Sequence, residues 1–80
     1  MNFKRRIGLD PHINGECTSS ATGCPDIWEL DNGKFAVIGV DKTDELKPIL
    51  PSDAGCGLDE RIVVIDRHIL VNAKSYIPTA

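Results

Sequence analysis

The chain is poor in aromatic residues and lacks long apolar segments. Its 80 residues include only two Phe, one Trp and one Tyr. No apolar run approaches the roughly 18 residues that a membrane-spanning helix needs. The basic residues at positions 4–6 are not followed by the apolar stretch of a signal peptide. These absences predict a protein without a membrane span, and we expect to find it in the cytoplasm.

Motifs for catalysis and metal binding are also missing. The sequence has no P-loop, no H-E-x-x-H and no glycine-rich dinucleotide signature. Its three cysteines are an odd number, which argues against a secreted disulfide framework. Cys17, Cys24 and Cys56 together with His68 could supply four zinc ligands, but they contain no C-x-x-C pair. We therefore expect no enzyme and no cofactor, and a small zinc-binding module that uses these residues remains an alternative.

The charge of the chain disfavours nucleic acid as a partner. The formal net charge is −3, with 12 acidic residues against nine Lys and Arg. An acidic domain repels the phosphate backbone, so non-specific binding to DNA or RNA is weakened. The basic residues at positions 4–6 are the only local exception, and three charges are few for an anionic partner.

The segment 27–40 is the clearest structural signal in the sequence. It consists of two apolar runs joined by Asn32-Gly33, a dipeptide typical of the two-residue type I′ turn of a β-hairpin. The second run, 35–40, is apolar on both faces under strict alternation, which is typical of a central, covered strand. On the first run, Trp28 and Leu30 share a face, and we expect both to point into the core.

The remaining sequence predicts a short helix, a third strand and a C-terminal helix. Thr43 is the expected N-cap of a helix of about two turns that ends near Pro48 and Pro51. After a loop at 51–60, the β-branched run 61–66 predicts a strand. A helical stripe follows, with Asp66 as its N-cap and Pro78 beyond its end; its apolar members are Ile69, Leu70, Ala73, Tyr76 and Ile77. The sequence thus predicts a small α+β fold.

The domain organisation follows from composition. Residues 1–23 are rich in Gly, Ser, Thr and Asn and lack a sustained period, so we expect a flexible N-terminal tail followed by a single small domain at 24–80. The loose alternation of Phe3, Ile7 and Leu9 leaves open a short edge strand that adds to the sheet or to a partner.

One segment resembles a known DNA-binding family. The run at 61–70, Arg-Ile-Val-Val-Ile-Asp-Arg-His-Ile-Leu, is similar to the strand and short helix of swapped-hairpin transition-state regulators. In that family Arg-Ile-Val-Ile-Pro precedes the helix, and here Asp66 takes the place of the proline. The resemblance implies a dimeric DNA-binding regulator in which Arg61 and Arg67 would contact the nucleic acid. We keep this function as an alternative.

A broader resemblance covers residues 24–78. The strings Cys-Pro-Asp-Ile-Trp-Glu-Leu at 24–30, Phe-Ala-Val-Ile-Gly at 35–39, Pro-x-Asp-Ala-Gly-Cys at 51–56 and Glu-Arg-Ile-Val-Val-Ile at 60–65 carry it. They resemble a group of short actinobacterial proteins without an assigned activity. The resemblance implies a cytoplasmic setting and no catalytic residues.

The function that we expect from the sequence is contact with other proteins. A chain of this size cannot easily cover two strands that are apolar on both faces, so a second copy or another protein is expected to do so. We therefore predict an accessory or regulatory module that forms a homodimer and binds an unidentified protein partner. Its interaction residues are predicted to include Trp28, Phe35, Arg61 and Arg67.

Overall fold

The computed structural model describes residues 1–10 and 24–79. Three strands, β1 (Phe3–Arg6), β2 (Asp26–Leu30) and β3 (Phe35–Ile38), form an antiparallel sheet in the order β1-β2-β3. Strands β4 (Val40–Asp41) and β5 (Val63–Val64) form a second antiparallel pair. Between them lie helix α1 (Thr43–Leu46) and the 3₁₀ turn η2 (Lys47–Ile49), and the chain ends with helix α2 (Arg67–Ala73) and the 3₁₀ turn η3 (Lys74–Tyr76). The small α+β fold predicted from the sequence is confirmed.

The N-terminal residues belong to the sheet, so the predicted flexible tail is wrong for this part of the chain. Strand β1 pairs with β2 through Phe3 opposite Leu30 and Arg6 opposite Trp28. The alternative of an edge strand is the one that the structure contains. Its pairing is reinforced by cross-strand ion pairs, which a reading based on composition does not detect. Residues 11–23, the rest of the predicted tail, lie outside the described residues.

The addition of β1 also changes the position of β3. The sequence predicts that the run 35–40 is a central strand, but β2 occupies the centre of the described sheet and β3 its edge. Apolar residues on both faces therefore do not mark a covered strand here. Phe35, Val37 and Ile38 are all exposed, and this exposure is the main departure from an ordinary small domain.

The hairpin between β2 and β3 closes with a three-residue loop instead of the predicted two-residue turn. The backbone N–H of Leu30 donates to the carbonyl of Lys34 (2.8 Å), and the N–H of Gly33 donates to the carbonyl of Leu30 (3.2 Å). The loop therefore contains residues 31–33. Only its last position requires glycine, because Gly33 has a φ of 84°. This arrangement is the usual three-residue hairpin, a turn followed by a left-handed residue.

The core is small and lies on one face of the sheet, under α2. Ile7 and Ile27 from the sheet side pack with Ile69 and Ala73 from α2. The two helical residues are four positions apart, as the predicted stripe requires, and Asp66 stands at the N-cap position as predicted. Trp28 lies on the opposite face from Ile27 and is only half-buried, so its predicted place in the core is wrong.

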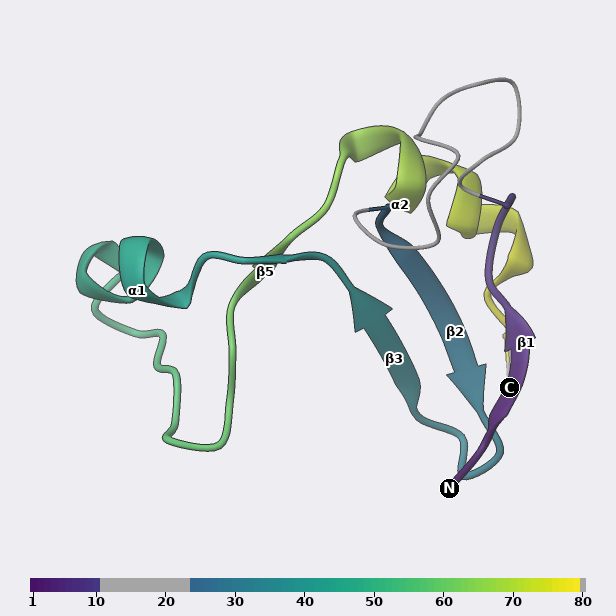
Figure 1. The fold of residues 1–80 in the computed structure, drawn as a ribbon, viewed down its shortest axis with the longest axis horizontal. Helices are drawn as coiled ribbons and strands as arrows, with labels where there is room; N and C mark the ends of the chain where they lie inside the picture. The colour runs from purple at the N-terminus through teal and green to yellow at the C-terminus, as the bar shows by residue number, and fades with distance from the viewer. Residues whose placement is uncertain (11–23, 80) are drawn as a thin grey trace.

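The segment 40–64 projects from the sheet as an arm (Figure 1). The arm starts with β4, carries α1 near its far end and returns through β5 to α2. The predicted strand at 61–66 is shorter than expected, because only Val63 and Val64 pair, and they pair with β4 rather than with the main sheet. Thr43 is the first residue of α1 and not its N-cap, a position that Lys42 occupies.

The arm makes the molecule extended. Its radius of gyration is 14.0 Å, whereas a compact chain of this length would have about 11.6 Å. Most residues of the arm are therefore exposed to solvent.

Candidate functional site

The four residues predicted to make contacts lie in four separate places. Trp28 is on the face of the sheet away from α2, and Phe35 is on the exposed edge strand β3. Arg61 lies on the arm, just before β5, and Arg67 is the exposed first residue of α2. The structure therefore does not assemble them into one site.

Trp28 is engaged in a cluster that joins β1 to β2. Its indole Nε1–H donates to Asp26 Oδ2 (2.9 Å), and the guanidinium of Arg6 lies 4.6 Å from the centre of its ring. Arg6 also binds the carboxylate of Asp26 through Nε and Nη2, and Phe3 contacts the Trp28 ring edge-on. Because Asp26 is only 8% exposed, this pairing satisfies a carboxylate removed from water. The cluster has a structural role, holding β1 in register.

A second ion pair acts in the same way on the face that carries α2. Arg5 Nε donates to Glu29 Oε1 at 2.7 Å, and Glu29 is buried. Sequence reasoning assigned no role to Arg5 or Arg6. The signal that could have predicted these ion pairs is charge: residues 4–6 are basic and the segment of β2 carries Asp26 and Glu29. Opposite charges on adjacent strands stabilise their pairing.

Arg61 connects the outgoing and the returning segment of the arm. Its Nε donates to Asp41 Oδ2 (3.0 Å), and Asp41 Oδ1 accepts hydrogen bonds from the Thr43 hydroxyl (2.6 Å) and backbone N–H (3.0 Å). The Thr43 hydroxyl in turn accepts from the N–H of Ile62 (2.7 Å). These hydrogen bonds, those from Thr43 first and that from Arg61 next, lower the pKa of Asp41 to about 2. The Asp41 carboxylate in turn raises the pKa of Arg61.

The surroundings of Arg61 do not favour binding to a nucleic acid. A shallow cleft of about 290 Å³ beside it is lined by Asp41, Asp44 and Glu45, with Lys42 as the other basic residue. The guanidinium is already paired, and the neighbouring carboxylates would repel a phosphate.

The cysteines do not form a common site in the described part of the chain. Cys56 is a free thiol, and its Sγ lies 3.3 Å from the carbonyl oxygen of Glu60 within the same loop. Cys24 takes part in a disulfide, so a bridge from Cys24 to Cys56 is absent. Cys17 lies outside the described residues. Among residues 1–10 and 24–79, no group of three His, Cys, Asp or Glu side chains is placed to hold a metal ion.

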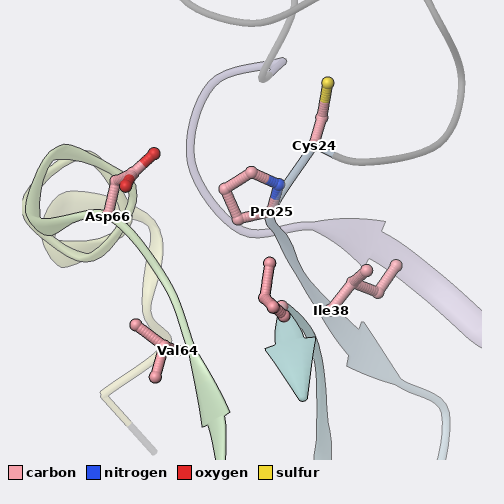
Figure 2. Close-up of a pocket in the computed structure, with 7 residues that line it drawn as sticks. Cys24, Pro25, Ile38, Val64 and Asp66 are labelled. Carbon is pink, nitrogen blue, oxygen red and sulfur yellow. The ribbon is translucent and has the colours of Figure 1, made fainter. Parts of the chain in front are cut away.

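An apolar cleft of about 350 Å³ lies between the sheet and the arm. Figure 2 shows Cys24 and Pro25, at the start of β2, on one side and Val64 and Asp66 on the other. Ile38, Gly39 and Val40 complete its lining. The cleft contains one carboxylate and few polar groups, so it offers apolar contact and no arrangement for catalysis.

Exposed apolar residues lie on both faces of β3 and on the two strands of the arm: Ile38, Val40 and Val64 line this cleft, whereas Phe35 and Val37 lie on the face of Ile27 and α2. We call these exposed residues together the strand surface: Phe35, Val37, Ile38, Val40, Val63 and Val64. Ile38 is 50% exposed and Val40 59%. Soluble monomers bury most of their large apolar side chains, and a concentration of exposed ones around a single edge strand favours contact with another protein. Phe35 is the predicted contact residue that belongs to the strand surface.

No helix of the described ranges is both long and apolar enough to cross a membrane. Comparison with protein-family models, curated proteins and solved structures finds no match to this chain.

Proposed function

We propose that the protein is a small, non-enzymatic module that acts through protein contact and assembles as a homodimer. The observation that carries this proposal is the strand surface, where six apolar residues of β3, β4 and β5 are exposed. The buried apolar residues of the described chain are no more numerous: Ile7, Cys24, Ile27, Leu30, Ile69 and Ala73. A chain with more exposed than buried large aliphatic side chains gains stability when a partner covers them.

The accessible area supports the same proposal. The chain exposes 6158 Å², whereas a compact monomer of 8.7 kDa would expose about 4,700 Å². The excess, roughly 1,400 Å², is larger than the approximately 800 Å² that each partner contributes to an interface of standard size. Burying about 800 Å² of each chain in an interface of standard size would remove about half of this excess.

Sedimentation velocity at micromolar concentration tests the proposal. The natural chain should sediment as a species of twice 8.7 kDa, and Ile38→Lys should shift it to the monomer because a charge on the strand surface would have to be desolvated. Val71→Lys is the matched control, since Val71 is 62% exposed on α2, outside the strand surface. A natural chain that stays monomeric at all concentrations would contradict the proposal.

A cytoplasmic setting belongs to the proposal as well. It is supported by the odd number of cysteines, whereas the disulfide at Cys24 is of a kind that persists mainly outside the cytosol. Alkylation of the protein in acid-quenched cells distinguishes a reduced, cytoplasmic protein from one in which the disulfide at Cys24 persists. A cytoplasmic protein should be modified on all three cysteines, and modification of Cys56 alone would contradict the assignment.

A further inference from the structure

The two outer strands of the sheet differ in how they are protected against strand addition. Strand β1 carries Lys4, Arg5 and Arg6, and its pairing with β2 shifts register between Phe3 and Arg5. Charged residues and irregular pairing are both known ways of blocking an edge. Strand β3 has the sequence Phe-Ala-Val-Ile, contains no charge, and its four residues pair with β2 without a shift. The edge of β3 is thus the unprotected one.

The hydrogen bonds fix which peptide groups of β3 face outward. Leu30 and Lys34 form a bonded pair, and in an antiparallel ladder bonded and non-bonded pairs alternate. Ala36 and Ile38 therefore direct their peptide groups to β2. Phe35 and Val37 direct theirs to the outer edge, where the described chain supplies no strand. The ladder from β1 agrees, because the N–H of Ile7 donates to the carbonyl of Ile27, the partner of Val37.

No strand of the arm pairs with this edge, although Figure 1 shows the arm on the side of β3 away from β2. The N–H of Lys42 donates to the carbonyl of Ile62, so the even-numbered residues of β4 direct their peptide groups toward β5. The even-numbered residues of β3 likewise direct their peptide groups toward β2. Strands β2 and β5 thus pair with the same side of the strand 35–41, and the apolar cleft is the gap between them. Between β3 and β4 the chain leaves the line of β3 and turns into the arm (Figure 1). A regular added strand is therefore confined to the length of β3.

We propose that this edge is occupied by β3 of a second copy, running antiparallel, with Ala36 on the two-fold axis. This inference rests on the proposed function and specifies its interface. If the pairing is confined to β3 and both Phe35 and Val37 bind the partner strand, Phe35 lies opposite Val37 of the other copy. Ala36 then lies opposite Ala36 of the other copy. Opposite residues in this register share a face of the sheet, so each face continues across the axis.

Two properties favour a second copy over a different protein. Self-pairing brings no like charges together, because β3 carries none. The product is also closed, since a sheet of six strands, three from each copy, has β1 at both outer edges, and both are protected. Self-pairing at β3 thus gives a dimer and not a fibre.

Disulfide trapping with one added cysteine at a time tests the register, in a Cys56→Ser background that keeps Cys17 and Cys24 and should itself stay uncross-linked. Opposite residues of a non-bonded antiparallel pair have Cα atoms about 4.5 Å apart, within the range that a disulfide bridges. Ala36→Cys should therefore cross-link with itself under mild oxidation. Phe35→Cys and Val37→Cys should cross-link when the two variants are mixed, and neither should do so alone. Val71→Cys is the control for random collision and should stay uncross-linked.

Val37→Pro tests the hydrogen bonds of the edge. The N–H of Val37 faces outward, so proline removes a donor to the partner and leaves the β2–β3 ladder intact. Self-association should weaken by about tenfold or more, as expected for the loss of at least one hydrogen bond at the interface, while the circular dichroism spectrum stays that of the natural chain. Val37→Thr, which keeps the N–H, should still dimerise.

The outcomes separate the inference from the proposed function. A dimer that forms normally with Val37→Pro and does not trap through Ala36→Cys uses another surface and overturns the inference alone. Trapping of Val37→Cys with itself overturns the register. A natural chain that is monomeric overturns both the inference and the proposed function.

Discussion

Asp41 connects the outgoing and the returning segment of the arm at its base. Its carboxylate accepts from Thr43, which follows β4, and from Arg61, which precedes β5. The pKa of Asp41 is lowered from 3.8 to about 2. A lowered carboxylate pKa means that the folded arm favours the charged form. The stabilisation is therefore complete above about pH 4 and is lost as the pH falls through 2.

Thr43→Val should raise the pKa of Asp41 toward its ordinary value, because the Thr43 hydroxyl makes the largest contribution to the shift. A carboxyl titration followed by NMR measures this pKa directly. Thr43→Ser keeps the hydroxyl and should leave the pKa near 2. An unchanged pKa in the valine variant would show that the hydrogen bond is not what holds Asp41 charged.

The face of the sheet on which Trp28 lies could not be predicted from the sequence. Trp28 is predicted as a core residue because of its size and alternation, yet it packs against Arg6 and Asp26 on the other face of the sheet. The choice of face depends on α2, which covers the side of Ile27. Alternation separates the two faces of a strand but does not tell which one a distant helix will cover.

Among the elements, β5 and the chain between β3 and β4 approach each other closely at Gly39. A Cβ at this position would lie 2.7 Å from the carbonyl oxygen of Val64 and 2.9 Å from Ile65 Cγ2. The carbonyl belongs to the backbone and cannot rotate away, so any larger residue must separate β5 from the chain at this position. Glycine is needed here for close approach of two chains.

Gly39→Ala should therefore loosen the arm, with a loss of about 1–3 kcal/mol in the free energy of arm closure, as is usual for steric overlap in a packed region. Hydrogen exchange of the Lys42 amide, which donates to Ile62, reports on this closure. Gly55→Ala is the control, because a Cβ at Gly55 would have no atom within 4 Å. Equal protection of Lys42 in both variants would contradict the role of Gly39.

Elements with strong local signals could be predicted from the sequence, whereas their partners could not. The hairpin is present because Gly33 supplies a left-handed residue between two apolar runs. Helix α2 has Asp66 at the N-cap position and buries Ile69 and Ala73 of the predicted stripe, but it ends at Ala73, and Leu70, Tyr76 and Ile77 are exposed. Strand β1 was predicted only as an alternative, because its charges resemble those of a solvated tail, although they are satisfied by Asp26 and Glu29 from a distant part of the sequence. Long-range pairing of this kind leaves no local pattern.

At the scale of the whole molecule, the balance between core and surface governs stability. The described core consists of Ile7, Ile27, Ile69 and Ala73, and a domain of this size is only marginally stable alone. If dimerisation covers the strand surface, folding and association are coupled, and the stability of the chain depends on its concentration.

Chemical denaturation at several protein concentrations measures this coupling. A hundredfold increase in concentration should raise the free energy of unfolding by about 2.7 kcal/mol per mole of dimer, which appears as a higher midpoint with an unchanged slope. Ile38→Lys should unfold at a lower midpoint that does not depend on concentration, because its monomer has no partner to lose. Val71→Lys should keep the concentration dependence of the natural chain. A midpoint of the natural chain that is the same at all concentrations would show that the small core is sufficient and that the strand surface stays uncovered.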